Sequence, residues 1–151
     1  MSIDIVKTTE CDAPLDAAFD YVADYRNVPS WLFGVQTFEP VGDIDHGLGA
    51  VFDGAMHLGV TLTSRIEVNE WVDNRLIGFD SVKGFKNSSR WNFEAAGEGR
   101  TLITAEVSYS LPFGPAGKAL GKVIEPFVKQ AVKHSSDHLR QRIEEAAGSR
   151  P

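Results

Sequence analysis

Apolar and polar residues alternate with a period of two from residue 35 to residue 111, a pattern typical of β-strands that bury one face. Clusters rich in Gly, Asn and Asp interrupt the alternation, which predicts separate strands joined by tight turns. These connections are too short for crossover helices, so we expect an antiparallel sheet. The predicted strands cover residues 35–41, 49–57, 59–70, 76–83, 86–96 and 101–111, and an earlier strand is predicted over 3–10.

Two short helices are predicted between the first and second strands. Pro14 stands at a first helical position, and Leu15, Phe19 and Val22 then recur at the spacing of one helix face. The stretch NVPSWLFG predicts a second helical turn that ends at Gly34.

A long amphipathic helix is predicted over residues 116–147, where apolar residues recur every three or four positions. Pro126 removes one backbone donor, which predicts a kink or a short separate helical piece at that point. We expect residues 1–147 to form one domain and residues 148–151 to form a disordered tail. The order of elements predicts an α+β fold in which helices pack on one face of a curved sheet.

Three predicted hairpin loops decide which side chains face the long helix. Cross-strand partners share a face, and a slip of one residue would exchange the two faces. Loops at residues 57–59, 73–74 and 98–100 agree on one apolar face. Its predicted members are Phe52, Met56, Val60, Leu62, Ile66, Val68, Ile77, Phe79, Trp91, Phe93, Ile103, Ala105, Val107, Tyr109 and Leu111.

This inner face is predicted to lack charge. Its polar groups are Ser64, Ser81 and the hydroxyl of Tyr109, whereas Arg65 and Arg90 fall on the opposite, solvated face. Without an interior cation there is no group to stabilise an enolate or an oxyanion. The pattern therefore favours binding over catalysis.

Composition describes an ordinary globular chain, with 42% hydrophobic and 24% charged residues among 151. No uncharged segment is long enough to cross a membrane or to act as a signal peptide, so we expect no integral membrane association. Cys11 is the only cysteine, which excludes an internal disulfide and fits a cytoplasmic location. We interpret it as a small apolar filler.

Charge is distributed unevenly within the net value of −6. Residues 1–117 carry 8 basic and 17 acidic side chains, whereas residues 118–151 carry 7 basic and 4 acidic ones. A basic helix can bind nucleic acid, but here its cations are scattered and the rest of the chain would repel phosphate. We predict no nucleic-acid partner, and a monomer or a homodimer.

His134 and His138 stand four residues apart on the long helix, a spacing that can hold a metal. Ser135 occupies the position where the helical zinc motif has Glu, and no Cys or carboxylate pair completes a site. We therefore predict no metal site and no cofactor. His138 lies nearer the apolar stripe and stays a weak candidate for acid–base chemistry, although a partly exposed surface histidine is the preferred interpretation.

The chain also resembles a known group of proteins. The stretches APLDAAFDYVADYRNVPSW, RWNFEAAGEGRTLITAEVSYSLP and HLRQRIEEAA, together with the order of elements, are similar to the START-like, or helix-grip (SRPBCC), superfamily and its polyketide cyclase/dehydrase and lipid-transport branch. The resemblance implies a helix-grip fold, a curved antiparallel sheet wrapped around the long C-terminal helix. It also implies a cavity between them that holds a small hydrophobic molecule.

Carried over residue by residue, the resemblance places two aromatic residues at the cavity entrance and the others on its walls and lid. The predicted ligand-binding residues are Trp31, Phe33, Phe52, Leu62, Ser64, Phe79, Ser81, Trp91, Phe93, Val107, Tyr109, Phe127 and Ala131.

Three functions follow as hypotheses. The leading one is a domain that binds or carries a lipid-like or aromatic, polyketide-like ligand. The second is a polyketide aromatase/cyclase or dehydratase with Tyr109, Ser64 and His138 as weak catalytic candidates; an inward Arg65 or Arg90 would favour it. The third is a surface interaction module with a filled core.

Overall fold

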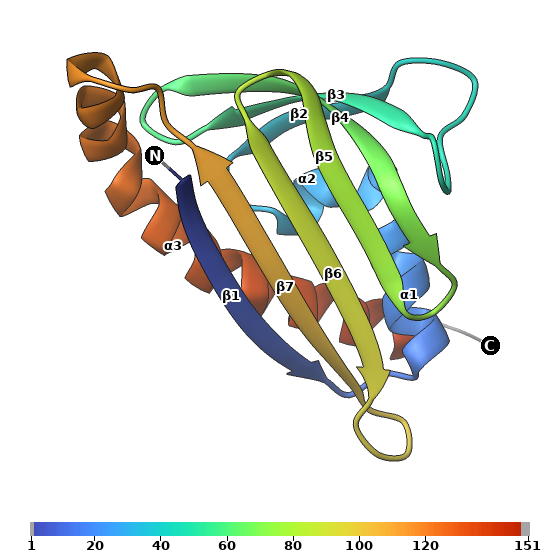
Figure 1. The fold of residues 1–151 in the computed structure, drawn as a ribbon. Helices are drawn as coiled ribbons and strands as arrows, with labels where there is room; N and C mark the ends of the chain where they lie inside the picture. The colour runs from blue at the N-terminus through green and yellow to red at the C-terminus, as the bar shows by residue number, and fades with distance from the viewer. Residues whose placement is uncertain (1, 149–151) are drawn as a thin grey trace.

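The computed structural model describes residues 2–148 and shows a curved sheet with one long helix across its concave face (Figure 1). All seven strands of the sheet are antiparallel, in the order β1-β7-β6-β5-β4-β3-β2. The helix-grip architecture predicted from the sequence is thus confirmed. The strands are β1 (Ser2–Cys11), β2 (Val35–Pro40), β3 (Val51–His57), β4 (Thr61–Val72), β5 (Leu76–Gly84), β6 (Asn87–Ala95) and β7 (Thr101–Ser110), and the helices are α1 (Leu15–Ala23), η1 (Tyr25–Asn27), α2 (Val28–Trp31) and α3 (Pro115–Gly148).

The long helix α3 is continuous and contains Pro126. Its axis bends in the N-terminal half (Figure 1), which agrees with the missing backbone donor of that proline. Gly148, where the predicted tail begins, is the last residue of the helix, and residues 149–151 lie outside the described part of the chain. No helix in residues 2–148 combines the length and the apolar composition that a bilayer crossing requires.

The register of all three hairpins differs in detail from the prediction. His57 pairs with Thr61, so the first loop is 58–60 and not 57–59. Ala95 pairs with Thr101, so the third loop covers residues 96–100 and its centre lies one residue earlier than that of the predicted loop 98–100. Both shifts move the register by two residues, so the same side chains still face the helix.

The second loop was predicted one residue too short, because Val72 pairs with Leu76 and leaves residues 73–75 between them. A register shift between Val68 and Glu70 then restores the predicted pair of Val68 with Phe79. Such a bulge inserts one extra residue into a strand and adds twist, so it offsets the error in loop length.

Buried side chains form two clusters between the sheet and the helices. The first is built around Phe19, Trp31, Phe93 and Leu139, and the second around Leu58, Tyr109 and Ile124. Because Ile124 and Leu139 lie 15 residues apart on α3, roughly 22 Å at helical rise, the clusters hold the two ends of this helix separately.

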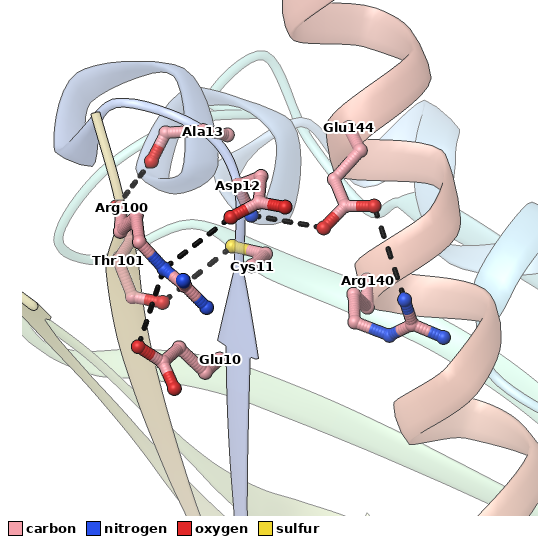
Figure 2. Close-up of polar contacts among 8 residues, drawn as sticks. All are labelled: Glu10, Cys11, Asp12, Ala13, Arg100, Thr101, Arg140 and Glu144. Atoms are coloured by element: carbon pink, nitrogen blue, oxygen red, sulfur yellow. Dashed lines mark hydrogen bonds and ion pairs between the residues drawn. The ribbon is translucent and has the colours of Figure 1, made fainter.

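Polar contacts attach the C-terminal part of α3 to the end of β1 (Figure 2). The carboxylate of Glu144 accepts a hydrogen bond from the backbone N–H of Asp12 at 2.9 Å and lies 3.9 Å from Arg140. Arg100 reaches the carboxylates of Glu10 and Asp12, each at 3.3 Å. The hydrogen bond between Glu144 and Asp12 thus joins α3 to the edge of the sheet.

At the other end, Gly117 brings the first turn of α3 against the preceding chain. A Cβ atom at this position would lie 1.6 Å from the carbonyl oxygen of Pro112, whereas a Cβ at Gly121 would meet only the flexible Leu111 Cδ1 at 3.0 Å. We expect Gly117→Ala to lower the free energy of unfolding by about 2 kcal/mol or more, because backbone must move. Urea unfolding measures this difference, and Gly121→Ala, expected within about 1 kcal/mol of the wild type, is the matched control. Equal effects of the two substitutions would contradict the close approach.

Cys11 supplies a second prediction. Its thiol is buried and donates to the carbonyl oxygen of Thr101 at 3.7 Å (Figure 2). Burial, and then the neighbouring carboxylate of Glu144, raise the pKa of this thiol to about 11. Since only the thiolate reacts, we expect the folded protein to resist a thiol-specific disulfide reagent at pH 8 and the urea-unfolded chain to react at once. Rapid reaction of the folded protein would contradict the burial.

Candidate functional site

A cavity of about 290 Å³ lies between the concave face of the sheet and α3. Side chains from β1 and β3 to β7 form one wall, and α2, β2 and the middle of α3 close the other sides. The cavity draws residues from both buried clusters, which places it between them. The interior is therefore open and not completely filled by protein.

Eight of the predicted ligand-binding residues lie on the wall of this cavity, and their binding role stays a prediction. They are Trp31, Leu62, Ser64, Phe79, Trp91, Val107, Tyr109 and Ala131. Six of them point inward by the alternation of their strands, Ala131 by the apolar stripe of α3, and Trp31 from the end of the short helix α2. Residues that the prediction missed include Ile5, Val28, Met56, Phe85, Val128 and Leu139.

Phe52 and Phe93 face the interior as predicted but do not line the cavity. The ring of Phe52 stacks on that of Phe38 at 4.8 Å, and Phe93 meets Phe19 edge to face at 5.2 Å. Both are buried in the first cluster, where other aromatic rings occupy the space in front of them. The face of the sheet was therefore predicted correctly for both residues, but packing decides which inward side chains border the cavity.

Phe33 and Phe127 also lie outside the cavity wall. The ring of Phe33 packs 5.6 Å from His134, and Phe127 covers Gly59, where a Cβ atom would lie 2.8 Å from its ring. His138 is exposed and does not line the cavity, so it has no position from which to act on a bound molecule. Within residues 2–148, no group of three His, Cys, Asp or Glu side chains is arranged to hold a metal.

Ser64 and Ser81 belong to a network that secures the start of β6. The Ser64 hydroxyl donates to the carbonyl oxygen of Phe85 at 2.8 Å and accepts from Asn87 Nδ2 at 3.0 Å. Asn87 Nδ2 also donates to the carbonyl of Phe85, and its backbone N–H donates to Ser81, which does not line the cavity. The hydroxyl proton of Ser64 is thus already engaged, which argues against a catalytic role.

Tyr109 provides the clearest unengaged polar group on the wall. No residue in the described part of the chain forms a hydrogen bond with its hydroxyl, although the side chain is 8% exposed. Burial, and to a lesser extent Glu125, raise the pKa of this phenol. Asn87 stands directly opposite Tyr109 in the sheet, and no described residue donates a hydrogen bond to its Oδ1, so this oxygen remains as an acceptor. Both residues line the cavity, so its wall offers a donor and an acceptor from neighbouring strands.

Two tryptophan rings form the opposite part of the wall. Trp31 and Trp91 pack edge to face with ring centroids 5.3 Å apart, and Trp91 Nε1 donates to the Ser89 hydroxyl at 3.1 Å. Trp31 Nε1 is buried without a hydrogen-bond acceptor in the described residues. A buried donor without a protein acceptor costs free energy unless another group accepts its hydrogen bond.

The two arginines that would have favoured catalysis lie on the outer face, as predicted. Arg65 forms a bidentate pair with Asp53, at 2.8 and 3.0 Å, and Arg90 lies 3.1 Å from Glu70. Both pairs are solvent-exposed, so neither guanidinium reaches the cavity.

The prediction of an inner face without charge is wrong at one position. Lys7 pairs with Ala105 across the β1–β7 ladder, and both residues line the cavity. The sequence of β1 indicated this position, because residues two apart in a strand share a face and Lys7 follows Ile3 and Ile5 at that spacing.

The family model described as "Polyketide cyclase / dehydrase and lipid transport" matches residues 2–144. No curated protein sequence matches the chain significantly.

Solved structures confirm the fold. The protein TTHA0849 from Thermus thermophilus is 20% identical with a TM-score of 0.80, over 96% of this chain and 99% of that one. A START superfamily protein from Mycobacterium smegmatis is 18% identical with a TM-score of 0.75, over 94% and 97% of the two chains. The Zhui aromatase/cyclase from Streptomyces sp. R1128 is 15% identical with a TM-score of 0.70, over 98% and 94%.

The hydroxyl groups of Ser64 and Tyr109, both predicted as catalytic candidates, differ in their hydrogen bonds, so their removal should affect stability differently. We expect Ser64→Ala to lower the free energy of unfolding by about 1–2 kcal/mol, because Asn87 Nδ2 loses a partner in a partly buried network. Tyr109→Phe is expected to stay within about 0.5 kcal/mol of the wild type, because its hydroxyl has no protein partner to lose. Urea unfolding of the two variants tests this, and a larger loss for Tyr109→Phe would reverse the assignment.

Proposed function

The chain belongs to the polyketide cyclase/dehydrase and lipid transport family, and on that premise we propose that it binds or carries a small hydrophobic molecule between the sheet and α3. The observation that carries the proposal is the cavity of about 290 Å³ with its predominantly apolar and aromatic lining. Pockets for small molecules typically measure roughly 300–1,000 Å³ and have a few polar groups in an apolar wall. The size therefore favours a compact lipid-like or aromatic, polyketide-like ligand.

Apolar burial supplies most of the binding free energy in this proposal, since the wall offers few polar partners. The Tyr109 hydroxyl and Asn87 Oδ1 give the ligand its orientation, because one donates and the other accepts from neighbouring strands of the cavity wall. A molecule with a carbonyl or hydroxyl group on a ring system satisfies both.

A polyketide aromatase/cyclase remains the alternative within the family, and Zhui is an example among the similar folds. An inward Arg65 or Arg90 would have favoured that hypothesis, but both side chains pair with carboxylates on the outer face. A surface module with a filled core is not favoured either, because the interior contains the cavity. Binding is the function that the geometry supports best.

Filling the cavity from α3 tests the proposal. Ala131 lines the cavity in the middle of the helix, so Ala131→Phe places a ring in the space that the ligand would occupy. We expect this variant to bind the uncharged fluorescent probe N-phenyl-naphthylamine at least about tenfold more weakly than the wild type, as measured by fluorescence titration.

Ala119→Phe is the matched control, because Ala119 is exposed on the same helix and does not line the cavity. Circular dichroism and urea unfolding establish that both variants fold. Unchanged probe binding in a folded Ala131→Phe protein would overturn the proposed function.

A further inference from the structure

Lys7 is the single charged residue among the described residues that line the cavity. It lies on β1, an edge strand of the sheet, between Ile5 and Thr9, which line the cavity as well. The side chain is exposed, so its aliphatic stem borders the cavity while the ammonium group remains close to water, as is common for lysine.

No carboxylate within residues 2–148 forms an ion pair with Lys7. The acidic residues of its own strand, Asp4 and Glu10, fall on the opposite face because they stand an odd number of residues away. The ammonium of Lys7 therefore has no ion-pair partner among the described residues.

Lys7 lies along the seam between β1 and the middle of α3. Ile5 packs in the cluster of Ile124, whereas Asp12 contacts Glu144 at the other end of the helix. Lys7 lies between Ile5 and Asp12 in the sequence. The segment of α3 that lines the cavity lies between Ile124 and Glu144, so Lys7 and this segment occupy the same part of the seam. The seam beside Lys7 is thus one boundary of the cavity.

The edge of α3 on this seam carries charges of both signs. Glu144 marks the edge that faces β1, and Lys133 and Arg140 lie within about 40° of it around the helix axis at 3.6 residues per turn. Arg140 is paired with Glu144, but no acidic residue in the described chain is paired with Lys133. Asp137 lies about 20° from Glu144 on the same edge, so this edge of α3 adds no net charge, and Lys7 is the charged residue that lines the cavity at the seam.

We propose that the ligand carries an acidic group, such as a carboxylate or sulfonate, that lies at this seam against the ammonium of Lys7 while its apolar body fills the cavity. This inference rests on the proposed binding function and specifies the class of ligand. An acidic group at the rim keeps part of its hydration, so the pair avoids most of the desolvation cost of a buried salt bridge.

Lys7 could instead protect the edge strand β1 from association with another sheet, and this role predicts a different experimental result. Inward-pointing lysines on edge strands also prevent edge-to-edge association of sheets. If that were its only role, replacing Lys7 would change self-association and leave the preference for ligand charge unaltered.

Two probes with the same aromatic body separate these roles. N-phenyl-naphthylamine is uncharged, and anilinonaphthalene sulfonate adds one sulfonate to the same rings. We expect Lys7→Met to weaken binding of the sulfonated probe about fivefold and to leave affinity for the uncharged probe within about twofold. Lys7→Arg is expected to retain the preference, since it keeps the charge.

Lys83→Met is the control, because Lys83 is exposed and pairs with the outward Arg65 across the sheet. It removes one positive charge from the other face, so both affinities should stay within about twofold of the wild type. An unchanged affinity of Lys7→Met for the sulfonated probe, or an equal loss for both probes, would overturn the inference. Failure of the wild type to bind the uncharged probe would instead overturn the proposed function on which it rests.

Discussion

The attachment of α3 at its two ends is the constraint on which the cavity depends. At one end Glu144 holds the backbone of Asp12, and at the other Gly117 lies against the carbonyl of Pro112. Between these points the helix spans a concave sheet, and most side chains that it presents to the cavity over residues 128–136 are small, as Ala131 is. The concave sheet curves away from the middle of the helix and leaves a gap, and short side chains do not fill it.

Strand parity made most of this arrangement predictable from the sequence. Two predicted hairpin registers were wrong by two residues, and an even error keeps every side chain on its face. In the hairpin between β4 and β5 a one-residue error in the loop was cancelled by the bulge near Asn69, so Val68 still meets Phe79. The outward position of Arg65 and Arg90, which argues against the cyclase hypothesis, was predictable for the same reason.

The alternation of a strand shows which side chains point inward, but it does not show which of them pack against other side chains and which border the cavity. Phe52 and Phe93 have the correct face, but Phe38 and Phe19 cover them. This depends on distances between elements remote in the sequence, which alternation does not encode. The alternation of β1 did contain the inward position of Lys7, but the predicted inner face covered only the strands after residue 50.

The same geometry favours carriage of a ligand over its chemical conversion. The proton of the Ser64 hydroxyl is engaged with a backbone carbonyl, and burial raises the pKa of Tyr109, so its phenol holds its proton at neutral pH and serves as a donor. The ammonium of Lys7 lies close to water, where a charge stabilises a developing negative charge far less than it would in a dry interior. For the proposed binding function, Tyr109 and Lys7 orient a ligand by its ends while the apolar wall buries its middle.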